Sequence, residues 1–323
     1  MAIVSGTGTR YDMQGLRESL HDRIYDISPE DTPFVMGAGR GPNAKQTLEE
    51  WQTDSLTAAG ANAQIEGDEA SFDTPSATTR VGNYTQIMRK TLILSDTLEQ
   101  VDKAGRRSEL AYQLAKRGAE IKRDLEFTLL ANTGGNGGNT TTARSMASMG
   151  AWVKTNTSIG TSGGDPSYTT GVPSAARTDG TQRAFTEAIA KTVIQAGWTQ
   201  GAKFTTLMVG PVNKQRVSTD FAGIATRNYD LSNVSAKPMA AIASIDVYVS
   251  DFGVMRVVPN RFQRERDAWF LDFEFVELRY LRPLSQVKLA KTGDAEKRMM
   301  VQEVTLCVKQ EAALGGAFDL TIT

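Results

Sequence analysis

Residues 52–80 are the part of the sequence that most limits what this chain can fold into. Leu56, Ile65 and Phe72 are the only large apolar side chains among them. A segment this poor in apolar residues cannot bury itself in a core, and loops of this length are uncommon inside a compact domain. The flanking stretches "TLEEWQTDSL" and "NYTQIMRKTLIL" have the composition of strands. We therefore expect a long β-hairpin arm that leaves the body of the protein and returns to it.

A second segment, residues 133–183, is dominated by Gly, Ser and Thr and is also expected to be loop-like. Within it, only "SMASMGAWV" has the apolar content that packing against a core requires. Neither segment is expected to offset the entropy cost of its own ordering by burying its side chains. Contact with neighbouring copies of the chain is the simplest compensation.

Residues 106–131 predict one long helix that could act as a spine. Gly118 lies in the apolar stripe of this helix, where it would allow close backbone approach. On the solvated face, Lys116 and Glu120 are spaced to form an ion pair, and so are Lys122 and Glu126. The stripe itself consists of Leu110, Leu114, Ile121, Leu125 and Leu129.

The rest of the chain alternates helix and strand patterns and then ends in strands. Residues 184–198 predict a helix, "KFTTLMVGP" a strand, and "VNKQRVSTDF" the start of another helix. "SIDVYVSDFGVMRVVP" reads as two strands joined near Gly253, and "QVKLAK" and "MMVQEVTLCVKQ" as two strands joined at residues 292–294. "WFLDFEFVELRYL" is expected to be a strand with alternate residues facing inward. The pattern predicts an α+β fold.

The stretch "IYDISPEDTPF" predicts a stiff apolar elbow near the start of the chain. Ser28 suits a helix N-cap and Pro29 the first helical position. Pro33 is expected to stop this helix after one turn, because it keeps Thr32 out of helical geometry. The apolar side chains around the turn, which we expect to contact another subunit, are Ile24, Tyr25, Ile27 and Phe34.

Composition excludes several classes of protein. A formal net charge of -1 argues against a strongly basic nucleic-acid binder. One cysteine and one histidine exclude an internal disulfide and a zinc site built from Cys and His ligands. No signal peptide or membrane-length apolar run is present, so we expect synthesis in a reducing cytoplasm and no membrane partner.

Two glycine-rich stretches only superficially suggest nucleotide binding. "GAGRGP", residues 37–42, has proline where a dinucleotide fingerprint needs glycine. "TGGNGGNTTT" lacks the phosphate-binding lysine and follows a predicted helix instead of preceding one. Both are interpreted as loops, and no cofactor is expected.

Candidate catalytic residues are few. Asp272 and Glu274 stand two apart on an expected strand, so they would share a face, as the paired carboxylates of a glycoside hydrolase could. Solvated strands carry such pairs as well. His21 has no rigid scaffold around it, and Cys307 has no histidine near it in sequence. A carbohydrate-active hydrolase stays one alternative, and a decoration or adhesion module with binding loops stays another.

Four motifs in order resemble one family over nearly the whole chain. They are "IYDISPEDTPF" followed by "EEWQTDSL", then "ELAYQLAKRGAEIKRDLE", then "ELRYLRPLSQVKLAKTGDAEKRMMVQEVTL". In this order they resemble the major capsid proteins of tailed bacteriophages, which have the Hong Kong ninety-seven-type capsid fold.

The resemblance implies a division into an N-terminal arm, an extended loop, a peripheral domain that contains the spine helix, and an α/β axial domain. The implied boundaries are 1–47 for the arm, 48–92 for the extended loop, 93–183 and 263–323 for the peripheral domain, and 184–262 for the axial domain.

The resemblance also implies a structural, non-enzymatic function. Copies of the chain would form pentameric and hexameric rings that close an icosahedral head around double-stranded DNA, through heterologous contacts. Scaffold, portal and cement proteins, and weak non-specific contact with packaged DNA, are the implied further partners. The expected intersubunit contacts are Ile24, Tyr25, Ile27, Pro29, Pro33, Phe34, Trp51, Ile65 and Phe72.

Overall fold

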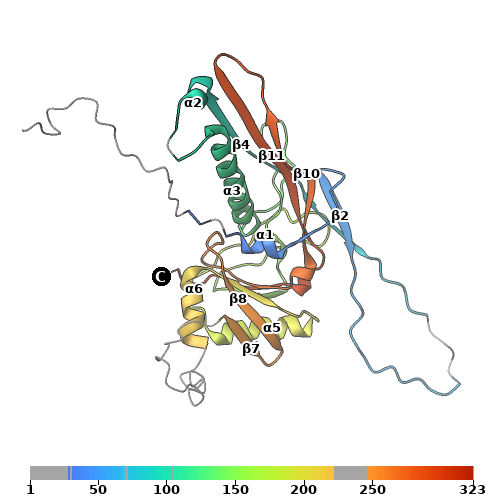
Figure 1. Ribbon diagram of the computed structural model, residues 1–323. Coiled ribbons are helices and arrows are strands. Elements are labelled where there is room, and N and C mark those ends of the chain that lie inside the picture. The colour runs from blue at the N-terminus through green and yellow to red at the C-terminus, as the bar shows by residue number, and fades with distance from the viewer. Residues whose placement is uncertain are drawn as a thin grey trace, which may run out of the picture.

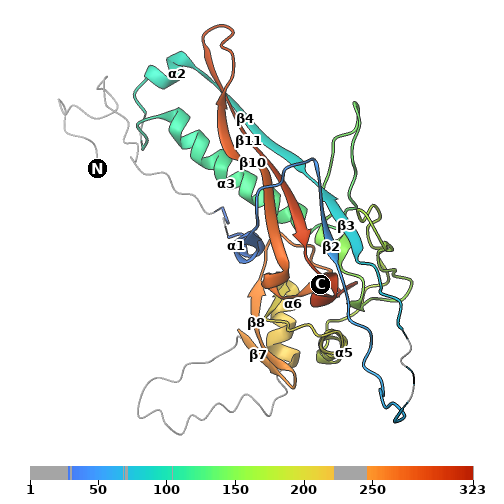
Figure 2. The same ribbon diagram turned by 90° about the vertical axis from the view of Figure 1, so that its right-hand side faces the viewer.

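The computed structural model describes residues 28–322 except 30, 68, 70, 71, 104 and 222–245. One long helix and a group of long strands lie at one end of the molecule, and a second sheet with its helices lies at the other (Figure 1). A hairpin beside the body carries a loop that projects away from it, as the view turned by 90° confirms (Figure 2). The predicted combination of spine, sheets and projecting arm is therefore observed.

The spine helix α3 spans Glu109–Leu129. Its first backbone N–H groups are satisfied from two sides: the Ser108 hydroxyl accepts from Ala111, and the Glu99 carboxylate accepts from Glu109 and Leu110. Glu99 belongs to the short helix α2 (Asp96–Gln100). The buried apolar side chains of α3 are Ile121, Leu125 and Leu129. The predicted helix and the C-terminal part of its stripe are confirmed.

The described strands next to the spine helix form a four-stranded sheet in the order β1-β10-β11-β4. The long antiparallel hairpin of β10 and β11 turns at Gly293, whose φ of 85° favours glycine. The helix α3 packs along β4 and β11. The strands are β1 (Gly39–Arg40), β4 (Gln86–Ser95), β10 (Val276–Lys288) and β11 (Ala295–Val308).

Among the described residues, a six-stranded sheet in the order β5-β12-β9-β6-β8-β7 makes up the other end of the molecule. Its central strands β6 and β9 are buried along their whole length, in agreement with sequences that are apolar except for Thr206. The strands are β5 (Asn156–Ser158), β6 (Thr206–Val209), β7 (Val247–Ser250), β8 (Gly253–Pro259), β9 (Ala268–Leu271) and β12 (Gly315–Ala317). The helices are α5 (Glu187–Thr199) and α6 (Pro211–Arg216), which continues as a π-helical turn, Val217–Phe221.

This sheet runs across the expected domain boundary between residues 262 and 263. Strand β9 pairs with β6, and β12 pairs with β9 and β5. Residues after 263 therefore contribute to the sheet assigned to the axial part as well as to β10 and β11. Sequence patterns do not show which distant strands pair, because each strand has the same local period wherever it docks.

The extended hairpin consists of β2 (Leu48–Thr53) and β3 (Thr79–Tyr84) in antiparallel register. The described residues of the connecting loop, 54–78, form no helix or strand. The predicted hairpin arm is thus confirmed. The expected single strand "NYTQIMRKTLIL" is divided at the buried residue Thr85, and β4 after it joins the four-stranded sheet.

The glycine-rich segment 133–183 is better packed than its composition suggests. As predicted, "SMASMGAWV" lies in the core: Met146, Met149 and Trp152 are buried, and α4 spans Met149–Trp152. Hydrogen bonds between Asn132 and the backbone of Arg177 tie the two ends of the segment together. The expectation that this segment needs neighbouring copies for its packing is wrong, because the segment packs against the core of its own subunit.

The predicted elbow has a different structure. Pro33 does not stop a helix but begins one, α1 (Pro33–Gly37), where its missing N–H is harmless. Ser28 and Pro29 are not helical. The helix therefore begins at Pro33 and not at Pro29, as the capping residues had predicted.

One strand interpretation also changes. After β9 the chain makes a short 3-10 turn, Phe273–Phe275, before β10, so Asp272 and Glu274 do not share a strand face. Asp272 is buried and accepts a hydrogen bond from the backbone N–H of Glu274, which makes it a cap. In β11, Leu306, Cys307 and Val308 are all buried, because both faces of the strand are covered there.

Candidate functional site

The loop 54–78 is the strongest candidate for a functional surface. Its three large apolar side chains are almost completely exposed: Leu56 at 99%, Ile65 at 80% and Phe72 at 96%. The loop points away from the rest of the subunit (Figure 2). A projecting loop with exposed apolar side chains is suited to contact with another molecule.

The root of the hairpin is fixed to the body by Trp51. Its indole ring stacks on that of Trp152 with centroids 5.3 Å apart, and its N–H donates to the carbonyl of Val308 at 2.9 Å. Aromatic stacking and a hydrogen bond from one side chain hold β2 in a defined direction. Trp51 therefore anchors the hairpin to the body of its own subunit.

Asn83 holds the other strand of the hairpin. Its buried amide donates to the carbonyls of Ala147 and Leu306, and its oxygen accepts from the N–H of Ala147 at 2.8 Å. Arg80 and Glu50 add an ion pair across the hairpin. The hairpin thus has a rigid base and a projecting end.

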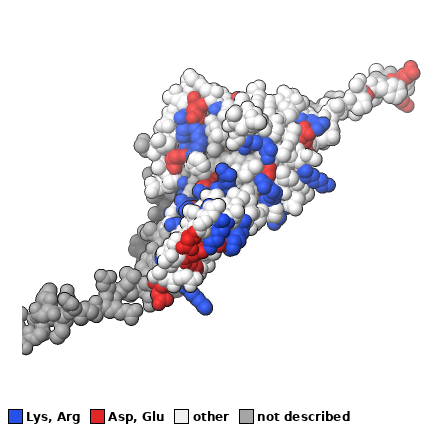
Figure 3. Space-filling view, turned by 90° about the horizontal axis from the view of Figure 1, so that it is seen from above, with Lys and Arg blue, Asp and Glu red and all other residues white. Residues whose placement is uncertain are grey.

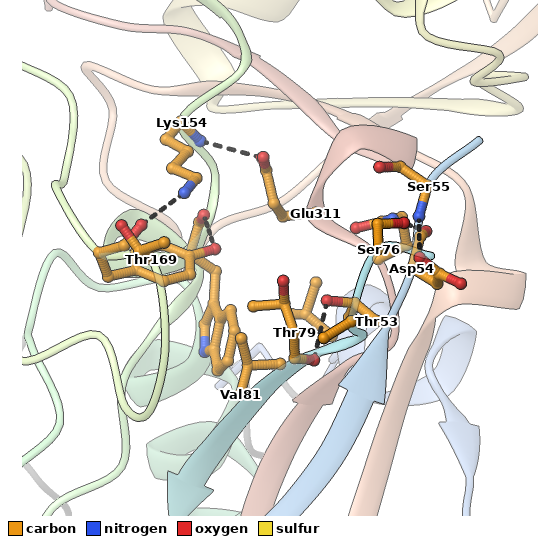
Figure 4. A pocket seen from close by; sticks show the side chains of 14 residues that line it. Thr53, Asp54, Ser55, Ser76, Thr79, Val81, Lys154, Thr169 and Glu311 are labelled. Carbon is orange, nitrogen blue, oxygen red and sulfur yellow. Dashed lines mark hydrogen bonds between the residues drawn. The ribbon is translucent and has the colours of Figure 1, made fainter. Parts of the chain in front are cut away.

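A cavity of about 370 Å³ lies where the hairpin meets the body (Figure 4). Thr53, Ser76 and Thr79 line it from the hairpin, and Lys154 and Glu311 line it from the body. Lys154 donates from Nζ to the Tyr168 carbonyl at 2.6 Å, and its backbone N–H donates to Glu311. Burial raises the pKa of the Tyr168 hydroxyl, which donates to the Trp152 carbonyl. The polar groups of the body bind one another, and the cavity lies between them and the hairpin.

The residues expected at subunit contacts have different outcomes. Ile24, Tyr25 and Ile27 lie outside the described residues. Pro29 and Pro33 are half-buried, and Ile65 and Phe72 are exposed.

Phe34 requires a correction. Its ring is completely buried in its own subunit and meets Phe273 edge to face at 5.9 Å. No surface of Phe34 remains for a neighbour. The apolar character of the elbow misled the sequence interpretation here, because the side chain packs inward once Pro33 begins a helix.

A second exposed apolar surface lies on the hairpin of β7 and β8 and was not singled out from the sequence. Val247, Val249 and Val254 project from it, and at its tip Phe252 lies 5.3 Å from the Trp198 ring at the end of α5. The alternation of Val247 and Val249 about Tyr248 could have indicated this surface, and Val254 joins it because it pairs with Val249.

Charged side chains form no large patch of one sign on the face shown in Figure 3, where Lys and Arg stand beside Asp and Glu. On α3, Arg117 pairs with Glu120 at 2.6 Å, and Lys90 of β4 pairs with Asp124 at 2.7 Å. The expected pair of Lys122 and Glu126 is not formed, because Glu126 is buried. Such mixed surfaces do not favour strong binding of nucleic acid.

The candidate catalytic residues are not brought together in the described part of the chain. No cluster of His, Cys, Asp and Glu among the described residues could hold a metal ion. Burial raises the pKa of the Cys307 thiol to about 12, which makes it unreactive, and His21 lies outside the described residues. Within the described ranges, no helix is long and apolar enough to cross a membrane.

Solved structures that match this chain over nearly its whole length define the class of this fold. A chain of the Cyanophage A-1(L) capsid asymmetric unit matches with a TM-score of 0.66 and 11% identity, over 95% of this chain and 97% of that one. A chain from Gordonia phage Cozz matches with a TM-score of 0.60 and 11% identity, over 99% and 98%. The fold is the Hong Kong ninety-seven-type capsid fold that the four motifs predicted.

Comparison of the sequence with known proteins shows the family to which this chain belongs. The model of the SU10 major capsid protein family matches residues 3–321, and this chain belongs to that family. It is also 44% identical over 122 residues to the major capsid protein of Escherichia phage Phieco32. That match covers 38% of this chain and 34% of the relative, so the chain matches about a third of the curated relative's length.

Proposed function

We propose that this chain is the structural unit of an icosahedral viral head, built from pentameric and hexameric rings around double-stranded DNA. The observation that carries the proposal is the loop 54–78, whose exposed Ile65 and Phe72 stand on a rigidly anchored hairpin in a member of a capsid-protein family. Apolar side chains so far from their own core are satisfied by neighbouring copies.

Rings require a head-to-tail contact in which two different surfaces of the subunit meet. The loop 54–78 supplies one surface, and the body of the next subunit supplies the other. Pro29 and Pro33, together with Ile24, Tyr25 and Ile27 before them, belong to the same set of proposed contacts. The proposed function is non-enzymatic and needs no cofactor.

Further partners follow from the same function. The subunit would be made in the host cytoplasm and would end in the virion. Scaffold, portal and cement proteins would assist assembly. Contact with packaged DNA would be weak and non-specific, in line with the mixed charges on the surface in Figure 3.

Replacing residues 57–78 by a short turn tests the proposal. Strands β2 and β3 are retained, because Thr53 and Thr79 are paired at the end of the hairpin. We expect soluble, folded subunits that fail to form closed shells in electron micrographs, while the unaltered chain forms them. Normal yields of closed shells from the shortened chain would refute the role of the loop.

Sedimentation separates this function from a decoration module. A shell protein yields very large particles or ring-sized pieces, whereas a decoration module stays small. If the unaltered chain remains monomeric under all assembly conditions, the proposed function is contradicted.

A further inference from the structure

Glu126 is a buried carboxylate on the spine helix that the assembly surfaces do not involve. Its side chain is completely inaccessible to solvent. Burial raises the pKa of this carboxyl group, while hydrogen bonds from its neighbours act in the opposite direction. The groups that hydrogen-bond to it are backbone N–H groups and an amide rather than a cation. A carboxylate in the last turns of a helix is also disfavoured by the helix dipole. The Glu126 carboxylate can therefore stay buried there only because of those three hydrogen bonds.

Two of the donors belong to the helix α1. The N–H of Phe34 donates to Glu126 Oε1 at 2.8 Å, and the N–H of Val35 donates to Oε2 at 2.7 Å. The N-cap residue of α1, Thr32, makes no side-chain cap, and Pro33 has no N–H. Glu126 therefore caps α1 in place of a local residue, from 92 positions away in sequence.

The third donor comes from the other end of the molecule. Asn260, directly after β8, donates from Nδ2 to Glu126 Oε1 at 2.6 Å. Its backbone N–H donates to the carbonyl of Val209 in β6, and its Oδ1 accepts from Phe262. The guanidinium of Arg123, also on α3, lies over the Phe262 ring at 5.3 Å. One carboxylate thus joins α1, the spine helix and the six-stranded sheet, which meet at the lower end of α3 in Figure 1.

We propose that Glu126 is a positioning residue that couples the start of α1 to the angle between the spine helix and the six-stranded sheet. The chain enters the body at α1, and after α1 it is held by the pairing of β1 with β10. The helix α1 is thus held at its start by Glu126 and at its end by the sheet. If α3 tilts against the sheet, the carboxylate cannot keep all three donors, and the start of α1 is released or turned.

Amide hydrogen exchange in the variant Glu126→Gln tests this coupling. Gln keeps the shape but places an NH₂ group against a donor, so that one hydrogen bond of the three is replaced by a repulsive contact. We expect exchange in the peptide covering residues 33–38 to accelerate about tenfold or more. The matched control is Asp124→Asn, which removes an exposed carboxylate of the same helix and should leave that peptide unchanged.

Asn260→Ala is the second variant and decides the question if Glu126→Gln does not fold. The Asn260 side chain donates to Glu126 and acts on α1 only through it, yet we expect faster exchange at residues 33–38 in this variant too. The double variant should exchange no faster there than Glu126→Gln alone, since both changes act through one carboxylate.

Two results would overturn the proposal. One is unchanged exchange at residues 33–38 in either single variant. The other is equal acceleration across α3 and both sheets, which would mean that Glu126 only stabilises the fold as a whole. Because the measurement is made on the subunit, its failure is distinct from a failure to form shells.

Discussion

At the scale of single residues, Asp267 and Arg177 are two buried ionisable groups whose pKa values are shifted by burial. Burial raises the pKa of Asp267 to about 6, although Arg264 and Arg177 favour its charged form. Burial also lowers the pKa of the Arg177 guanidinium to about 10. Both groups lie where the segment 133–183 meets the sheet. The charges at this contact are therefore held at a cost in solvation.

Asp267→Asn should change the pH dependence of stability. The folded-state pKa of Asp267 lies above the reference value of 3.8, so folding disfavours the ionised form. Its contribution to stability is therefore lost as the pH rises from about 4 to about 6. Relative to the unaltered chain, the variant should gain on the order of 3 kcal/mol in unfolding free energy between pH 4 and pH 7.

Urea denaturation of the subunit at a series of pH values measures this difference. Asp73→Asn, in the exposed loop, is the control and should leave the profile unchanged. Parallel profiles for Asp267→Asn and the unaltered chain would show that the buried carboxyl group does not titrate in this window.

At the scale of elements, the extended hairpin combines a fixed base with a free end. Trp51 anchors β2 through stacking and one hydrogen bond, and Asn83 anchors β3 through buried hydrogen bonds to the segment before α4 and to β11. Neither contact is with a neighbour in sequence. The direction of the arm is thus set by the body of the subunit, before any assembly.

Asn83→Ala should destabilise the subunit by roughly 2–4 kcal/mol, because it leaves buried backbone groups of Ala147 and Leu306 unpaired. Urea denaturation measures the effect. Asn62→Ala, in the exposed loop, should cost less than about 0.5 kcal/mol. Equal stabilities of the two variants would mean that the hairpin is not anchored through Asn83.

At the scale of the whole molecule, the described residues form two hydrophobic cores, and the strands β6 and β9 of the six-stranded sheet contribute side chains to both. One contains the buried side of α3 with Met146, Met149 and Trp152, and the other lies between the six-stranded sheet and α5. Together they account for the stability of the subunit without the loop 54–78. Assembly and folding can therefore be tested separately.

Ile65→Asp and Phe72→Asp should leave the unfolding free energy within about 0.5 kcal/mol, since both side chains are exposed. They should nevertheless reduce the yield of large particles in sedimentation, because a charge replaces an apolar contact between subunits. Ala58→Asp, an exposed position of the same loop, controls for added charge. Full particle yields from both variants would place the assembly contact elsewhere.

The sequence by itself determined the elements whose pattern is local. The spine helix, the hairpin arm around residues 54–78, and the turns at Gly253 and Gly293 follow from side-chain periodicity and from glycine at tight turns. The capsid fold could be predicted because these elements occur in a characteristic order.

Only the tertiary structure decided which residues lie inside and which strands pair. Glu126 has the spacing of a solvated ion pair but caps α1, and Phe34 resembles an outward contact but lies in the core. Nothing in the local sequence of β9 indicates that it pairs with β6. A helix or strand period depends on residues a few positions apart, whereas the burial of a polar group depends on partners such as Phe34 and Glu126, which lie 92 positions apart.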